Sequence, residues 1–209
     1  MIATLTPTTD RPTLDHLDDE AILGCLAAHG AVLFRGFDLD LDRFSAIVQR
    51  FCGHVTFDPA RQGVFGKAQR VDAGTSAVGL HLENGFTAFP PELVFFYCEA
   101  AARSGSETTV CDGKQVWRAL SDGARDWFSA HDIKVRRTIP EPIWRAYVAN
   151  ELGVDGGPDA VTAAHLDELV ARNPRQSLQF VDEGAIDYAL LVAGRTHGLF
   201  DTEPAFANS

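Results

Sequence analysis

The residues best suited to chemistry lie between Gly79 and Phe86, in the segment GLHLENGF. In an extended strand, residues two apart project from the same face, so His81 and Glu83 would present an imidazole nitrogen and a carboxylate oxygen side by side. Such a pair supplies two ligands of a two-histidine, one-carboxylate site, which leaves positions open on iron for a cosubstrate and dioxygen. The spacing alone is a weak signal in a chain with 7 histidines, and a polar pair without a metal is the alternative.

The segments around this pair predict the elements that must position it. Apolar residues at helical spacing and capping residues predict helices, which we expect over residues 17–29, after Asp40 or Asp42 to residue 51, over 114–130 with a break at 121–123, around 143–152 and over 159–172. Short apolar or alternating runs predict strands over residues 31–35, 93–98, 107–112, 133–139 and 185–193. Residues 1–13 are typical of an extended lead-in. We expect Trp117, Trp127, Phe95 and Phe96 in the core.

This order of elements favours an α+β fold with a β-sandwich or barrel core over an alternating parallel sheet. The sequence contains no GxGxxG or GxxxxGK[ST] motif for a nucleotide. It also lacks the GxSxG motif of the α/β-hydrolases.

Composition excludes several classes of protein. The 209 residues are 45% hydrophobic and carry a net charge of -11, which disfavours nucleic acid and anionic membrane as partners. We find no membrane-spanning run and no secretory signal. The four cysteines lack CxxC spacing, and we expect buried, reduced thiols in a cytoplasmic protein rather than a disulfide or zinc framework.

Three motifs in the right order resemble one family. The segment LAAHGAVLFRGFDLDLDRFSAIVQRF, residues 26–51, is similar to the N-terminal signature of the taurine dioxygenase-like (TauD/TfdA) iron(II)- and 2-oxoglutarate-dependent oxygenases. His81 and Glu83 follow where that family places its HxD/E pair. Residues 90–120 then resemble its strand, glycine turn and "ET" strand that lead into a helix.

The resemblance implies a function and a site. It implies a double-stranded β-helix (jelly roll) with N-terminal helices and helical insertions, in which His81 and Glu83 hold Fe(II) and Thr108 meets a carboxylate of the cosubstrate 2-oxoglutarate. HxE rather than HxD resembles the clavaminate synthase-like branch, which implies oxidation of an amino acid or an amino acid-derived small molecule by O2. A carboxylate at position 83 favours hydroxylation over halogenation. Asn84 and Phe86, beside the pair, are candidates for lining the substrate pocket.

The chain departs from the family pattern at its end. The family has a distal histidine as third iron ligand, followed by an arginine that pairs with 2-oxoglutarate. The late histidine here is His197, which no arginine follows, so the third ligand is either His197 or a residue beyond Ser209. We therefore expect one jelly-roll domain over residues 1–209 that lacks its C-terminal part. The alternative is a non-catalytic member of the fold that acts as a binding or interaction module, and either could form a homo-oligomer.

Overall fold

A computed structural model describes residues 2–8, 13–58, 61, 64–65, 67–71 and 76–206. The fold is α+β. Its helices are α1 (Asp19–His29), α2 (Leu41–Phe51), α3 (Gly113–Ala119), α4 (Asp122–Ala130), α5 (Glu141–Leu152) and α6 (Ala163–Ala171), with 3-10 turns at Leu14–His16, Gly157–Ala160 and Asp182–Gly184. Its strands are β1 (Ala3–Leu5), β2 (Val32–Phe34), β3 (Val64–Phe65), β4 (Ala68–Gln69), β5 (Asp132–Ile139), β6 (Gln176–Phe180), β7 (Ile186–Ala193), β8 (Thr196–His197) and β9 (Pro204–Ala205).

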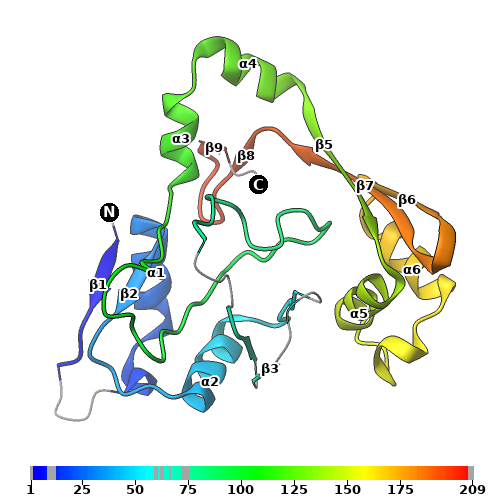
Figure 1. Cartoon of the computed structure of the whole chain (residues 1–209). Helices are drawn as coiled ribbons and strands as arrows, with labels where there is room; N and C mark the ends of the chain where they lie inside the picture. The colour runs from blue at the N-terminus through cyan, green and yellow to red at the C-terminus, as the bar shows by residue number, and fades with distance from the viewer. Residues whose placement is uncertain are drawn as a thin grey trace.

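The N-terminal elements form one side of the molecule (Figure 1). Helix α1 begins where the Asp18 side chain accepts a hydrogen bond from the Ala21 amide, and it ends at Gly30, whose φ of 75° suits a residue without a Cβ. Strands β1 and β2, which precede and follow this helix in the sequence, pair in parallel. Asp40, rather than Asp42, caps α2 by accepting from the Arg43 amide at 2.8 Å.

The main hydrophobic core lies on the opposite side of the molecule, between a sheet and two helices (Figure 1). The sheet is antiparallel in the order β5-β7-β6. Its inward face carries Ile186, Tyr188 and Leu190, which alternate with less buried residues along β7. Trp144 and Val148 of α5 pack against them, with further apolar side chains from α6. Strand β5 of this sheet reaches the HxE segment through Arg137, which donates to the carbonyl of Phe86.

Two predicted strands are not formed in the part of the chain that the structure describes. Residues 93–98 and 107–112 contain no strand, although residues 91–98 alternate strictly between half-buried and exposed. Phe95 and Tyr97 point toward α2, where their rings lie 6.2 Å from Phe51 and 5.5 Å from Phe44. Val94 and Phe96 are 47% and 55% exposed on the other side. The alternation gives this segment the side-chain pattern of a strand, but a strand also needs a hydrogen-bonded neighbour.

Other predictions are confirmed or wrong in detail. The helices over 114–130 break at Ser121, which caps α4, and β6 was not predicted. Trp117 is buried and Phe95 half-buried, whereas Trp127 and Phe96 are exposed because the faces that carry them have no covering element in the described residues. The cysteines are free, but none is buried, and Cys98 and Cys111 are exposed for the same reason.

Two further expectations concern the first residues and the membrane. The extended lead-in is confirmed at β1, while residues 1 and 9–12 lie outside the described residues. None of the helices in the described ranges is long and apolar enough to cross a membrane.

Candidate functional site

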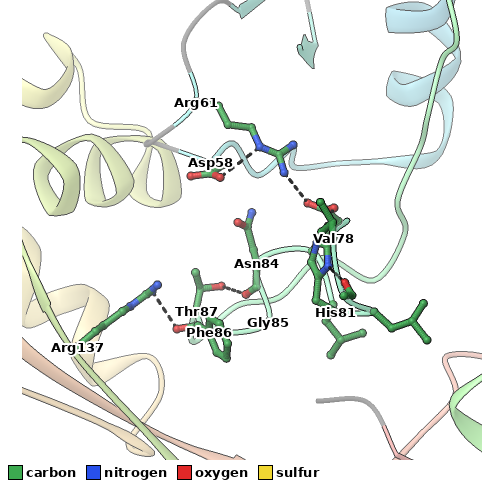
Figure 2. A pocket seen from close by; sticks show the side chains of 13 residues that line it. Asp58, Arg61, Val78, His81, Asn84, Gly85, Phe86, Thr87 and Arg137 are labelled. Carbon is green, nitrogen blue, oxygen red and sulfur yellow. Dashed lines mark hydrogen bonds and ion pairs between the residues drawn. The ribbon is translucent and has the colours of Figure 1, made fainter. Parts of the chain in front are cut away.

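The HxE segment lines a cavity of about 470 Å³ (Figure 2). Most of its wall is the continuous stretch from Val78 to Thr87. Asp58 and Arg61 line it from the chain that follows α2, and Arg137 lines it from β5. The structure therefore places three segments that are distant in sequence around the predicted pair. His81, Glu83, Asn84 and Phe86 all line this one cavity.

His81 is held with one ring nitrogen fixed and the other pointing at Glu83. Its Nδ1 lies 2.8 Å from the carbonyl oxygen of Gly79. Because a carbonyl oxygen only accepts, Nδ1 carries the proton and donates it. In the neutral ring Nε2 then carries a lone pair, and Nε2 lies 3.5 Å from Oε1 of Glu83. A backbone carbonyl that fixes the tautomer in this way is the usual support of a metal-binding histidine.

The second carboxylate oxygen of Glu83 takes part in a row of ion pairs that runs through Arg61 to Asp58. Its Oε2 lies 3.4 Å from Nη2 of Arg61, and Nε of Arg61 lies 3.3 Å from Asp58. The Glu83 side chain is 25% exposed, so the site is open to a ligand while water is partly excluded. Arg61 thus fixes the carboxylate and leaves Oε1 facing the imidazole.

The turn after Leu82 brings Glu83 back toward His81. The amide of Gly85 donates to the carbonyl of Leu82 at 3.1 Å. Asn84 has a φ of 51°, a left-handed conformation that asparagine tolerates better than most residues. Thr87 donates from its amide and its hydroxyl to the carbonyl of Asn84. Sequence reasoning placed His81 and Glu83 on one face of a strand. The structure describes both residues and shows no strand here, and Glu83 lies instead in the turn that begins at Leu82.

The donor set fits a divalent cation. A neutral imidazole nitrogen and a carboxylate oxygen both present lone pairs, so they repel each other unless a proton or a cation lies between them. Nitrogen and oxygen ligands of this kind suit iron(II). No group of three or more His, Cys, Asp or Glu side chains gathers into a metal site among the described residues. His81 and Glu83 are therefore two ligands of a set that the described residues do not complete.

The structure keeps the other predicted residues away from this cavity. Thr108 lies exposed in the segment before α3, which forms neither helix nor strand, and it does not line the cavity. His197, in β8, is exposed, and its Nδ1 contacts the carbonyl of Gly198 at 3.0 Å. Neither residue is beside His81 and Glu83 in this arrangement.

Sequence reasoning missed the two arginines of the cavity. The residues around Arg61 in the sequence do not predict its role, because that role depends on a contact with Glu83 that forms only when the chain folds. Arg137 does give one, since it stands at an inward position of β5 between Val135 and Ile139, where an apolar residue is expected. Its Nη2 donates to the carbonyl of Phe86 at 3.0 Å.

Comparison with known proteins gives a family and a relative. Residues 2–207 match the family described as "Taurine catabolism dioxygenase TauD, TfdA family". The chain is also 29% identical over 123 residues to the "Dapdiamide synthesis protein DdaC" of Enterobacter agglomerans. That alignment covers 54% of this chain and 37% of the relative, so the chain matches little more than a third of the relative's length.

Proposed function

Because the chain belongs to the taurine catabolism dioxygenase TauD, TfdA family, whose members are iron(II)- and 2-oxoglutarate-dependent oxygenases, we propose that it acts in such an oxygenase through the cavity around His81 and Glu83. The observation that carries the proposal is the facing pair itself. Nε2 of His81 and Oε1 of Glu83 lie 3.5 Å apart, and each is fixed from behind, by Gly79 and by Arg61. The two atoms are thus presented toward one ligand.

Each residue of the cavity has a part in this proposal. His81 and Glu83 hold Fe(II), and Arg61 keeps Glu83 oriented. Asn84 and Phe86 line the space that the organic substrate enters. Thr108 contacts a carboxylate of 2-oxoglutarate, which requires its segment to approach the cavity more closely than it does here. When bound, iron(II), 2-oxoglutarate and dioxygen supply the oxidant for a C–H bond of the substrate.

We propose an amino acid or an amino acid-derived molecule as substrate. The glutamate at position 83 supports this through the resemblance to clavaminate synthase-like enzymes. The relative's name places it in the synthesis of dapdiamide. A carboxylate ligand at position 83 also fills the place that a halide would need, which favours hydroxylation or another oxidation without halogen transfer.

We further propose that the chain contributes to a jelly roll. Large apolar side chains are exposed in residues 91–98 and in the stretches around Leu80 and Val110, none of which forms a helix or strand. Monomeric proteins seldom leave contiguous apolar faces open. A second layer of strands over these faces would bury them and would pair with backbone that forms no strand in the described residues.

Anaerobic titration tests the enzyme proposal. Adding Fe(II) and then 2-oxoglutarate to the folded chain should produce a weak charge-transfer absorption band in the visible region. His81→Ala should abolish the band, whereas His131→Ala, which removes an exposed histidine far from the cavity lining, should leave it intact. No band and no 2-oxoglutarate consumption in folded wild-type protein would contradict the proposal.

A second candidate is a non-catalytic binding module of the same fold. The observation that favours it is that the described residues bring no third metal-binding side chain to His81 and Glu83. Under this alternative the chain binds a small molecule or a partner without consuming 2-oxoglutarate. Ligand binding that is unchanged in His81→Ala, together with absence of turnover, would favour this candidate.

A further inference from the structure

Arg137 is a cation on the inward side of the β5-β7-β6 sheet, where its neighbours on β5 and its opposite residues on β7 are mostly apolar. In the register of β5 and β7, Val135, Arg137 and Ile139 lie opposite Leu190, Tyr188 and Ile186. The three partners on β7 are buried core residues. The sheet therefore carries a guanidinium at the margin of its hydrophobic face, where an aliphatic side chain would pack without cost.

The surroundings of Arg137 fix its guanidinium and leave most of it free to bind. It lies 5.8 Å from the centroid of the Tyr188 ring, and one nitrogen donates to the carbonyl of Phe86. A guanidinium has five N–H donors, and the described residues give Arg137 no carboxylate partner. Figure 2 shows the side chain reaching from β5 toward the turn that carries Phe86 and Thr87.

The positive charge of Arg137 also acts on the buried phenols beside the cavity. Burial raises the pKa of Tyr188 to about 12, and Arg137 opposes that rise. The pKa of Tyr147 is also raised, mainly by burial and to a smaller extent by the charge of Glu151, and the charge of Arg137 opposes this rise as well. Arg137 is exposed, so its charge acts on these phenols while its guanidinium stays open to solvent and to a ligand.

The neighbouring arginine on the same strand behaves differently. Arg136 projects to the opposite face, where its Nε lies 3.1 Å from Oδ1 of Asp187 and its Nη2 pairs with Oδ2. Arg61, the other arginine of the cavity, is occupied by Asp58 and Glu83. Of the cations that line the cavity, Arg137 alone has no acidic partner among the described residues.

We propose that Arg137 binds the carboxylate of a small molecule in the cavity that holds His81 and Glu83. A protein with a net charge of -11 repels anions on average, so a carboxylate ligand needs a local cation to enter. A planar guanidinium held from one side matches a carboxylate through paired hydrogen bonds. The inference rests on the proposed function for the identity of the cavity, but carboxylate binding does not require the metal.

Two molecules could bring this carboxylate, the cosubstrate or the organic substrate. The experiment therefore has two arms, both with metal-free chain in buffer treated with chelating resin. One arm titrates 2-oxoglutarate beside its uncharged dimethyl ester. The other titrates L-alanine, L-asparagine and L-lysine, each beside its primary amide. Calorimetry or ligand-observed NMR gives the dissociation constants.

The variants distinguish the effect of the Arg137 side chain on ligand binding from the effect of the protein's net charge. Arg137→Met should weaken the carboxylate ligand by roughly ten- to a hundredfold, the range for a hydrogen-bonded charged group, and Arg137→Lys should restore part of the loss. Arg136→Met removes the same charge from the opposite face and should change binding less than twofold. The ester or amide should bind wild-type protein at least tenfold more weakly than the acid, a comparison that stands even if Arg137→Met fails to fold.

Three outcomes would overturn the proposal. They are unchanged binding in folded Arg137→Met, an equal loss in Arg136→Met, or no binding of any of these acids to the wild-type chain. Mn(II) binding is measured on the same variants. If Arg137→Met still binds Mn(II) but no longer binds the carboxylic acid, the inference is supported. If the wild-type chain binds the acid but no Mn(II), the proposed oxygenase function is contradicted, while the role of Arg137 in binding the carboxylate still holds.

Discussion

Replacing Glu83 by glutamine should weaken divalent metal binding by at least thirtyfold. The amide keeps the shape of the side chain, and its oxygen can still accept from Arg61, which lies 3.4 Å from Oε2. Only the negative charge beside Nε2 of His81 is lost. The effect on the metal therefore reports the charge of Glu83 rather than its packing.

The magnitude follows from the exposure of the site. Two unit charges about 4 Å apart attract by about 1 kcal/mol in bulk water and by about 4 kcal/mol at an effective dielectric constant of 20. A divalent ion doubles these values, so even full solvent screening leaves about 2 kcal/mol, or about thirtyfold in the dissociation constant. Glu83 is 25% exposed, which places the true loss at or above that bound. Repulsion from Arg61 is present in both proteins and cancels in the comparison.

Mn(II) titration followed by electron paramagnetic resonance measures the loss, because free Mn(II) gives a signal that bound Mn(II) does not. Glu92→Gln is the matched control, since it removes the same charge from an exposed residue outside the cavity lining. Equal affinity of wild-type protein and Glu83→Gln would refute the assignment of Glu83 as a ligand. An equal loss in Glu92→Gln would show that net charge alone governs binding.

Three further predictions concern stability. Val148 is 1% exposed, so Val148→Ala should lower the free energy of unfolding in urea by roughly 2 kcal/mol, whereas Val94→Ala, at a 47% exposed site, should change it far less. Burial raises the pKa of Tyr188 from 10.0 to about 12; the folded state then holds a proton that the unfolded state releases, and stability measured by denaturant titration should fall as the pH rises above about 10. A hydrogen bond from Arg136 lowers the pKa of Asp187 below its usual 3.8. The Asp187–Arg136 interaction therefore stabilises the folded state above pH 3.8, and this stabilisation disappears as the pH falls through the lower folded pKa of Asp187. Arg136→Met should destabilise the protein at neutral pH but not in strong acid. Thermal unfolding of both proteins at the two pH values measures this difference.

Local sequence was sufficient for most helices. Asp40 caps α2 and Ser121 caps α4 where the sequence predicts a start or a break, because a capping side chain acts on an amide only a few residues away. Helix α1 begins after Asp18, inside the predicted range of 17–29. Gly30 ends α1 for an equally local reason. Strands were less predictable, because β6 exists through its pairing with β7, and residues 93–98 have the side-chain alternation of a strand without such a neighbour.

The sequence by itself determined the α+β class, the family and the HxE pair, since motif order and the separation of His81 from Glu83 are properties of the chain. Only the tertiary structure decided what surrounds that pair. The carbonyl of Gly79 fixes the tautomer of His81, and Arg61 reaches Glu83 across 22 residues. The inward direction of Arg137 follows from its register against Tyr188 rather than from its own neighbours in sequence. Ligand direction and charge pairing depend on contacts between distant segments, and such contacts exist only once the chain has folded.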